Sequence, residues 1–285
     1  MKYLIVMADD FGLAESINDG IVKAYKEGIV TDLNFLPSGE AFEHAVGLAK
    51  GLGIEDVGAH LSLTETAPVS APRNVPTLVT GSGRFHKDRS ALFLAHFTWR
   101  LDRNEVYTEL KAQLDLLKSR GLKISVLSSH EHIHMMPFMF DIFIDLAREY
   151  EIPFLRYIRG DKLISPVNIK KFLKYLILVF FEMGSRKIID KKKINCSDSL
   201  RGFIDSGDIN EESLLKILNS LGDGIVELVC HPGLLSPRVL DKYKFHINCE
   251  RELAALMSRR ARRFIAESAI VTARYGSLIR TGAGH

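Results

Sequence analysis

The chain has 285 residues with 46% hydrophobic and 26% charged side chains, which are the proportions of an ordinary soluble globular protein. This length fits one large α/β barrel or two smaller domains. The formal net charge is only +3 and no basic stripe with interleaved aromatic residues is present, so a nucleic-acid partner is not expected.

The three cysteines, Cys196, Cys230 and Cys249, are widely spaced and contain no C-x-x-C pair. A disulfide framework or a thiolate zinc site is therefore not expected, and a reducing compartment is the better fit. The N-terminal MKYLIVMADD reaches charged residues too soon for a signal peptide, and no stretch supplies the roughly 20 apolar residues of a membrane-spanning helix. The sequence predicts a cytoplasmic protein.

Apolar runs alternate with helical patterns along the whole chain. We expect strands at 3–8, 29–36, 57–63, 124–127, 154–158 and 225–230, and helices at 17–27, 104–120, 139–150, 211–221 and 250–267. Such alternation is typical of parallel strands with crossover helices. No composition shift marks a domain boundary, so we expect a single domain over 1–285.

Two segments depart from this alternation. The connection 66–102 is long, and its prolines and glycines predict an ordered active-site loop rather than a linker. Residues 165–193 resemble an insertion, with an apolar run at 176–181 between clusters of lysine.

On a helix, one face of this insertion would carry Phe172, Tyr175, Leu176, Val179 and Met183, and Leu173, Ile177 and Phe180 would widen it. Two interpretations are open. The helix could be buried against the barrel with basic ends, or it could lie on anionic lipid and present a lipid-linked amino sugar.

Polar residues of unusual chemistry follow five of the predicted strands. They are Asp9-Asp10, His60, the segment SSHEHIH at 128–134, Arg156 and His231. In a parallel barrel all strand C-termini open on one face, where such enzymes keep their sites. Residues far apart in the chain are therefore expected to meet in one bowl.

Each feature also has a structural interpretation. The aspartates could cap a helix, His60 could be a packed core histidine, and His231 could belong to a turn. In an extended segment, however, His130, His132 and His134 would project to the same side, and metal ligation explains three crowded imidazoles better than burial does.

A carboxylate and two imidazoles suit a divalent ion such as zinc, or a harder ion that keeps more water. Such an ion lowers the pKa of bound water and polarises a carbonyl. A neighbouring carboxylate could then take the water's proton, while a separate histidine protonates the leaving group. The residues predict metal-assisted hydrolysis.

The sequence resembles the YdjC-like carbohydrate deacetylases, which include chito-oligosaccharide deacetylases and a group associated with hopanoid lipid biosynthesis. The resemblance covers most of the chain. Its motifs are ADDFG (8–12), GIVT (28–31), GAHLSLT (58–64), VPTL (75–78), SHEHIHM (129–135), IPFLR (152–156) and CHPG (230–233). It implies an α/β fold, a deformed (β/α) TIM-like barrel of the polysaccharide-deacetylase type.

The resemblance also implies roles for individual residues. Asp10, His60 and His130 would hold one divalent metal ion, zinc or magnesium. Asp9 would be the general base and His231 the general acid of the reaction.

Three further residues are implied at the substrate site. Arg156 would orient a carboxylate or contact the substrate, and His132 and His134 would line the pocket or support the ligands. The chain departs from the family at Ser128, where an aspartate is usual, and at Glu65, near the usual position of a glycine. Loss of that aspartate puts the metal affinity in question.

The implied activity is that of a metal-dependent hydrolase that removes the N-acetyl group from an amino sugar, either in an oligosaccharide or in a lipid-linked saccharide. Two alternatives are open. One is hydrolysis of another amide or ester on a glycolipid or nucleoside, and the other is a catalytically silent, metal-dependent saccharide-binding protein. Peripheral contact with the inner membrane face and a homodimer are left open as well.

Overall fold

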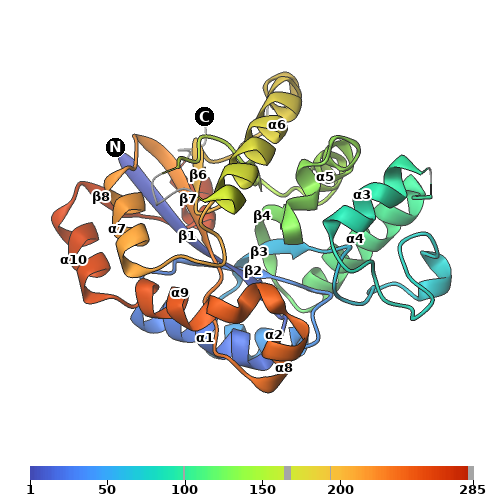
Figure 1. The fold of residues 1–285 in the computed structure, drawn as a ribbon, viewed down its shortest axis with the longest axis horizontal. Helices are drawn as coiled ribbons and strands as arrows, with labels where there is room; N and C mark the ends of the chain where they lie inside the picture. Colours follow the sequence, from blue (N-terminus) through green and yellow to red (C-terminus); the bar gives the residue numbers. More distant parts are fainter. Residues whose placement is uncertain (99, 164–167, 193, 282–285) are drawn as a thin grey trace.

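The computed structural model describes residues 1–98, 100–163, 168–192 and 194–281. Within them, eight parallel strands form one sheet in the order β5-β4-β3-β2-β1-β7-β6, and β8 pairs with β1 (Figure 1). The strands are β1 Lys2–Phe11, β2 Asp32–Phe35, β3 Asp56–Leu61, β4 Lys123–Ser129, β5 Phe154–Leu155, β6 Ser199–Arg201, β7 Gly224–Cys230 and β8 Ile270–Thr272.

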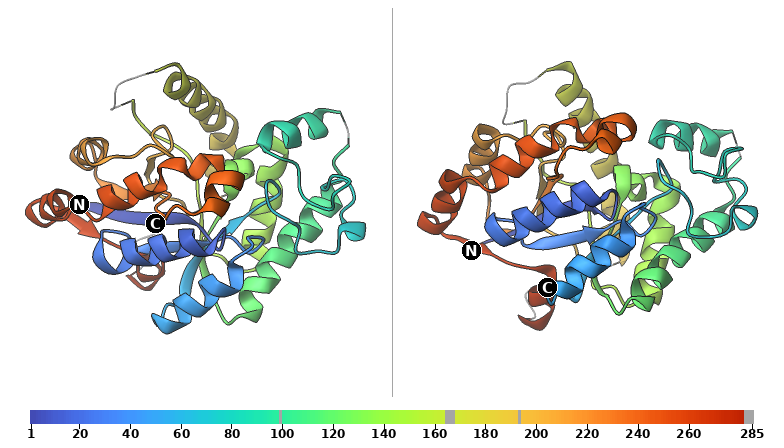
Figure 2. Two further views of the ribbon diagram at one scale, coloured as in Figure 1. Left: turned by 60° about the horizontal axis from the view of Figure 1, so that its bottom comes forward. Right: turned by 90° about the horizontal axis from the view of Figure 1, so that it is seen from below.

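Helices connect these strands and cover the outside of the sheet. They are α1 Glu15–Glu27, α2 Phe42–Gly51, α3 Arg89–Phe97, α4 Arg103–Ser119, α5 Pro137–Glu149, α6 Ile169–Lys192, α7 Glu211–Asn219, α8 Pro237–Lys242, α9 Cys249–Leu256, α10 Arg259–Glu267 and α11 Tyr275–Thr281. Short 3₁₀ helices are η1 Pro72–Asn74, η2 His130–Met135 and η3 Lys244–Asn248. Seen from below, α1 and α2 lie side by side across the sheet (Figure 2).

The sheet forms a half-barrel, which confirms the predicted α/β class and the parallel strands. Its two edge strands are β5 and β6. Backbone hydrogen bonds from Leu155 N to Asn195 O (3.0 Å) and from Leu200 N to Arg159 O (2.9 Å) tie the segments at these two edges together. All strands therefore direct their C-terminal ends toward one mouth, as the crossover pattern predicts.

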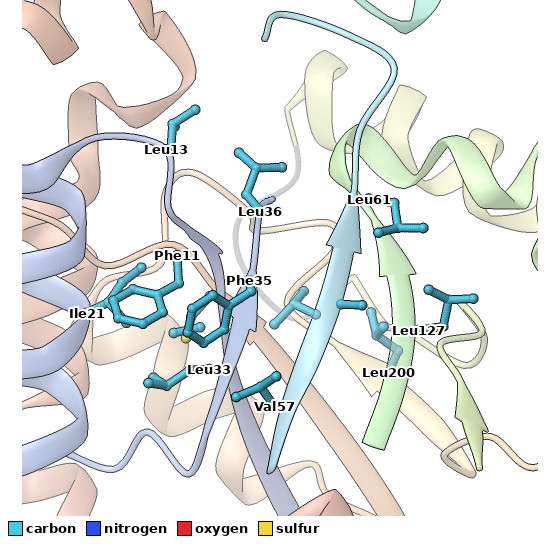
Figure 3. Packing of buried hydrophobic residues seen from close by; sticks show 14 of the residues in the cluster. Phe11, Leu13, Ile21, Leu33, Phe35, Leu36, Val57, Leu61, Leu127 and Leu200 are labelled. Atoms are coloured by element: carbon cyan, nitrogen blue, oxygen red, sulfur yellow. The ribbon is translucent and has the colours of Figure 1, made fainter. Parts of the chain in front are cut away.

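Apolar side chains of the central strands pack against helix α1 (Figure 3). Phe11, Phe35 and Ile21 are fully buried there, and the rings of Phe11 and Phe35 meet edge to face with centroids 4.8 Å apart. Each such side chain contributes roughly 1.5–3 kcal/mol by burial. This core fixes the ends of β1 and β2, where the polar residues of the site begin.

The predicted helix at 250–267 is wrong, because the chain breaks into α9 and α10 at Met257 and Ser258. The Ser258 hydroxyl accepts hydrogen bonds from the backbone N–H groups of Arg260 and Ala261. A serine that satisfies free N–H groups in this way starts a new helix.

The connection 66–102 is held by carboxylates of α4. Glu109 accepts hydrogen bonds from the N–H groups of Val69 and Ser70, each at 2.9 Å, and Glu105 accepts one from Thr77 at 2.7 Å. Helices η1 and α3 lie within this connection, and residue 99 is outside the described residues. Carboxylate anchoring of its backbone keeps the loop against the barrel.

Helix α6 turns its apolar face outward, so the buried interpretation of this segment is wrong. Leu178 packs inward, with Tyr175 and Ile177 partly buried against the core. The outward side chains are between 44% and 76% exposed and comprise Ile169, Phe172, Leu173, Leu176, Phe180 and Met183. Residues 165–167 and 193 of the predicted insertion are outside the described residues. No described helix combines the length and apolar character needed to span a membrane.

Candidate functional site

A cavity of about 190 Å³ opens at the C-terminal ends of the strands. Its lining contains the predicted residues Asp9, Asp10, His60, His130, His132 and His231, together with Glu65, Arg89, Glu131, Lys174, Phe203, Ser206 and Phe245. A larger and more open hollow of about 660 Å³ lies between α6 and α7, and none of the predicted site residues lines it. The chemistry therefore points to the smaller cavity.

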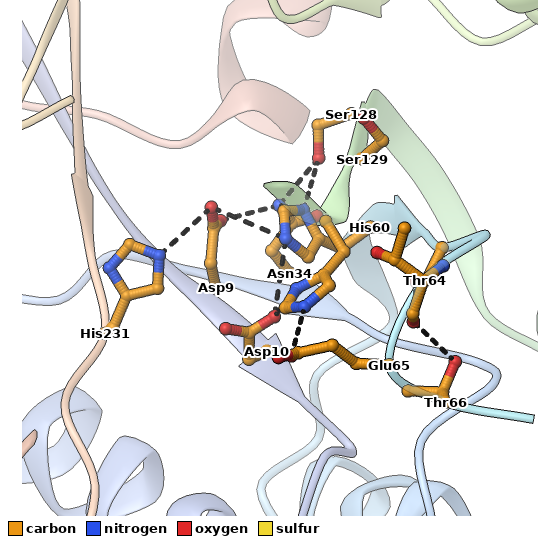
Figure 4. Close-up of polar contacts among 12 residues, drawn as sticks. Asp9, Asp10, Asn34, His60, Thr64, Glu65, Thr66, Ser128, Ser129 and His231 are labelled. Carbon is orange, nitrogen blue, oxygen red and sulfur yellow. Dashed lines mark hydrogen bonds and ion pairs between the residues drawn. The ribbon is translucent and has the colours of Figure 1, made fainter. Parts of the chain in front are cut away.

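Asp10, His60 and His130 bring one carboxylate and two imidazoles together. Figure 4 shows Asp10 and His60 of this group. Their possible ligand atoms all lie within 4.8 Å of one another. Asp10 Oδ1 is 2.7 Å from His130 Nδ1 and 3.5 Å from His60 Nε2. This donor set fits a divalent ion such as zinc with positions left open for water and substrate.

The two aspartates reach the same cavity because β1 is irregular at its end. Neighbouring side chains of a regular strand point to opposite faces. Here the pairing of β1 with β2 shifts register between Ala8 and Phe11, and Asp10 has a left-handed φ of 65°. As a result, oxygens of Asp9 and Asp10 lie 3.8 and 3.5 Å from the same nitrogen, His60 Nε2.

Asn34 and Ser128 contact His60 on the side away from Asp10. Asn34 Nδ2 donates to Asp9 Oδ1 at 2.7 Å and to Ser128 Oγ at 2.8 Å, and Ser128 Oγ lies 2.9 Å from His60 Nδ1. A partner at the outer ring nitrogen fixes the orientation of a ligand histidine. The hydroxyl of Ser128 thus contacts the ring nitrogen of His60 that faces away from Asp10.

Two residues that the sequence did not point to contact the candidate metal-binding group. His246 on η3 places Nε2 3.1 Å from Asp10 Oδ2, outside hydrogen-bond geometry, and neither of its ring nitrogens has a hydrogen-bond partner within the described part of the chain. Glu65, with a left-handed φ of 59°, places Oε2 3.0 Å from His130 Nε2. No strand pattern precedes His246, so the sequence carried no signal for it.

Arg156 is fully buried, binds Asp9 and does not line the cavity. Its Nη1 and Nη2 donate to the two oxygens of Asp9 at 2.6 and 2.8 Å, and its Nε donates to Glu227 Oε1 at 2.7 Å. Burial alone would raise the pKa of the Asp9 carboxyl, but Arg156 and the nearby histidines hold it well below its usual range. Of the two roles implied for Arg156, the geometry favours orienting a carboxylate over contacting substrate.

His231 faces Asp9 across the cavity. Its Nε2 is 4.0 Å from Asp9 Oδ2, and its backbone N–H donates to Glu252 Oε2 at 2.7 Å. Burial lowers the pKa of His231, while Glu252 and the two aspartates act in the opposite direction. The imidazole can therefore exchange a proton with a group placed between it and Asp9.

The extended arrangement predicted for His130, His132 and His134 is wrong. The segment is the 3₁₀ helix η2, in which Glu131 and His132 have left-handed φ values of 50° and 55°. His132 lines the cavity against the ring of Phe203. His134 is instead buried behind it, with Nδ1 2.6 Å from Ser129 Oγ and Nε2 3.1 Å from Arg156 O.

Comparisons with known proteins agree with this geometry. A family model described as YdjC-like protein matches residues 3–267. The carbohydrate deacetylase of Brevibacillus brevis is 32% identical over 96% of this chain and 99% of its own length, and that of Thermoanaerobacter pseudethanolicus is 28% identical over 98% and 100%. The crystal structure of a putative cellobiose-phosphate cleavage protein from Enterococcus faecalis superposes with a TM-score of 0.78 at 26% identity, over 97% of this chain and 98% of that one.

Proposed function

This chain belongs to the YdjC-like protein family, and we propose on that basis that it is a metal-dependent hydrolase that removes the N-acetyl group of an amino sugar. The observation that carries the proposal is the juxtaposition of the Asp10, His60 and His130 cluster with the pair Asp9 and His231. Relatives named carbohydrate deacetylase over nearly the whole chain support the same activity.

Asp10, His60 and His130 would hold the ion, and their oxygen and nitrogen donors suit zinc or magnesium. When bound, it would lower the pKa of a water molecule and polarise the acetyl carbonyl. Asp10 Oδ1 faces both imidazoles, so Asp10 would provide the carboxylate of this ligand set.

Asp9 would accept a proton from the attacking water. Arg156 and Asn34 occupy one side of its carboxylate and keep it ionised and fixed, while Oδ2 also faces His60 and His231. A new bond forms between the water oxygen and the acetyl carbon, and the bond from that carbon to nitrogen breaks. His231 Nε2 would donate the proton that the departing amine requires.

The test is acetate release from N-acetylated monosaccharides and oligosaccharides, with and without a chelator. We expect release that chelation abolishes and that zinc or magnesium restores. Release only from O-acetyl esters or other amides would favour the alternative hydrolase. Saccharide binding that requires metal but releases no acetate would favour the catalytically silent protein.

A lipid-linked saccharide at a membrane surface is the finer form of this proposal. Several apolar side chains of α6, among them Leu173 and Leu176, are exposed on the protein surface, which is typical of a helix that contacts another apolar surface. With the lysines of the same helix they suit peripheral contact with anionic lipid. Co-sedimentation with anionic vesicles should fall in a Leu173→Gln, Leu176→Gln variant. Absence of binding by the unaltered protein, with full activity on short soluble sugars, would reject membrane contact.

A further inference from the structure

Two cations in the cavity have no part in the proposed hydrolysis. Arg89 begins α3 and Lys174 lies on α6, and both line the cavity. Lys174 Nζ donates to the backbone oxygen of Ser206 at 2.9 Å, and Arg89 Nη1 donates to the backbone oxygen of Glu131 at 3.4 Å. Carbonyl oxygens, not carboxylates, are thus the partners of both groups.

Within the part of the chain that the structure describes, no carboxylate forms an ion pair with the side chain of Arg89 or Lys174, although Glu65 and Glu131 line the same cavity. Lys171, one turn earlier on α6, differs because its Nζ lies 2.7 Å from Asp205 Oδ1. Burial lowers the pKa of Lys174, the charge of Glu252 acts in the opposite direction, and the nearby charge of Arg89 lowers it further. A partly buried cation that no carboxylate contacts directly costs free energy, and an anionic ligand in contact with it would recover part of that cost.

The helices that carry these cations are also the ones with apolar outer faces. Helix α3 exposes Phe93, Leu94 and Phe97 by 41% to 64%, and the rings of Phe93 and Phe97 are 4.4 Å apart. Helix α6 exposes the apolar residues from Ile169 to Met183 given above. Both helices stand at the same end of the molecule, α6 above the sheet and α3 to its right (Figure 1). Each helix therefore joins a cavity cation to an apolar outer surface.

We propose that Arg89 and Lys174 bind the phosphate of a phosphodiester that links the amino sugar to a lipid chain, and that the chain lies on the outer faces of α3 and α6. The proposal rests on the deacetylase function and specifies its substrate. The guanidinium presents a planar pair of donors to phosphate oxygens, and the ammonium adds a point charge. The sugar enters the cavity, the phosphate stays at its rim, and the lipid remains outside.

Four ligands with one N-acetylglucosamine head separate these contributions. They are the free sugar, its 1-phosphate, its octyl glycoside and its octyl phosphodiester. The kcat/KM for acetate release is measured for each, and calorimetry gives the affinity of the deacetylated forms, which undergo no turnover. We expect the octyl phosphodiester to bind about tenfold more tightly than either the octyl glycoside or the 1-phosphate, because it alone offers both charge and chain.

Variants assign each contribution to its residues. Arg89→Met and Lys174→Met should each remove most of the gain from phosphate and leave the gain from the octyl chain. Phe93→Gln with Leu173→Gln should do the reverse. Lys87→Met is the matched control, since it removes one exposed charge beside α3 that does not line the cavity.

Equal affinity for the octyl glycoside and the octyl phosphodiester would overturn the phosphate site. Equal affinity for the 1-phosphate and the octyl phosphodiester would overturn the lipid chain and identify a soluble sugar phosphate. Failure of the deacetylase function is distinguishable, because none of the four acetylated ligands would then release acetate while the calorimetry still decides the phosphate site.

Discussion

The guanidinium of Arg156 holds both carboxylate oxygens of Asp9, at 2.6 and 2.8 Å, in a part of the protein closed to solvent. Glu227 binds the same guanidinium through Oε1 and accepts a hydrogen bond from Tyr275 Oη at 2.7 Å. Asp9 is therefore an ionised group in a fixed position, which is the state that a general base requires. A buried charge pair of this kind is costly to break, and this gives the first prediction.

Arg156→Lys should lower kcat at least tenfold, because an ammonium cannot hold both oxygens of Asp9 in one plane. Arg156→Met should in addition lower the free energy of unfolding by about 3–5 kcal/mol, since it leaves a buried carboxylate without its partner. Kinetics and urea unfolding measure the two effects. Arg159→Lys is the control, because Arg159 pairs more loosely with Asp198 at 3.6 Å near the surface. Wild-type kcat in Arg156→Met would show that Asp9 needs no such support.

Substitutions of the two adjacent aspartates should have different effects, one on turnover and the other on metal content. Asp9→Asn should retain the ion but lose most turnover, because an amide cannot accept the proton of water. Asp10→Asn should lower the affinity for the metal ion, since Asp10 Oδ1 faces both imidazoles. His231→Ala should lower kcat by roughly 10²–10⁴ at unchanged metal content. Elemental analysis with kinetics decides this, and equal metal loss in both aspartate variants would reject the division of roles.

His246→Ala should weaken metal binding by about 10- to 100-fold, the usual effect of losing a group that orients a ligand. The reason is its position 3.1 Å from Asp10 Oδ2, on the side of the carboxylate away from His130. Competition with a chelator measures the affinity. His44→Ala is the matched control. This half-exposed histidine lies 3.8 Å from Asp19 and does not line the cavity that contains the Asp10, His60 and His130 cluster. An unchanged affinity in His246→Ala would assign His246 to packing alone.

The sequence predicts the residues of the site better than their orientation. Asp9, His60 and His231 follow apolar runs that form β1, β3 and β7, so the rule that parallel strands end at one face places them together. The left-handed backbone at Asp10 and His132 gives no such signal, because non-glycine residues adopt it only where the surrounding structure imposes it. This is why both aspartates reach the cavity and why the histidine segment is not extended.

The periodicity of apolar residues likewise does not predict whether the apolar face of a helix points toward the protein or toward solvent. Periodicity identifies residues that share one side of a helix, but it does not say whether that side meets protein or solvent. On α6, Leu178 turns inward together with Lys174, while Leu176 turns outward. Hydrogen bonds at the inner face of α6 fix which side of the helix faces the protein. Lys174 Nζ donates to the backbone oxygen of Ser206, and Tyr157 Oη donates to the backbone oxygen of Glu182 at 2.9 Å.

Gly58→Ala should damage the site from a distance, through Asn34. A Cβ at this position would lie 2.4 Å from Asn34 Oδ1, so the amide that donates to Asp9 and Ser128 would have to move. We expect a lower kcat and a loss of about 1–3 kcal/mol in unfolding free energy, typical of overpacking.

The control for this prediction is Gly47→Ala on α2, where nothing lies within 4 Å of the added Cβ. That substitution should leave kcat unchanged and raise stability by up to about 1 kcal/mol, because alanine favours a helix over glycine. If Gly58→Ala behaved in the same way as Gly47→Ala, the proposed support of Asp9 by Asn34 would be wrong.

Asp32 should make the protein less stable as the pH rises toward neutrality. Burial raises the pKa of this carboxyl to about 7, although Thr31, Arg274 and the N–H of Tyr275, which donates to Oδ1 at 3.2 Å, act in the opposite direction. Oδ2 has no hydrogen-bond partner among the described residues. Below the ordinary pKa near 4, both folded and unfolded chains carry the proton and no penalty exists. Between about 4 and 7 the unfolded chain loses the proton first, so stability falls, and above 7 the full penalty is present.

Asp32→Asn removes this penalty, because the amide is neutral at every pH and its oxygen can still accept from Tyr275. The difference between a folded pKa of about 7 and the ordinary value of 3.8 sets an upper limit of roughly 4 kcal/mol on the gain at pH 8. The gain should shrink to about 1 kcal/mol at pH 4.5, where Asp32 is protonated in the folded protein and the pH is only slightly above the ordinary pKa of the unfolded carboxyl. Urea unfolding of the two proteins at both pH values isolates the effect, since all other titrating groups are shared. An equal difference at pH 4.5 and pH 8 would mean that Asp32 is already ionised in the folded protein at the lower pH.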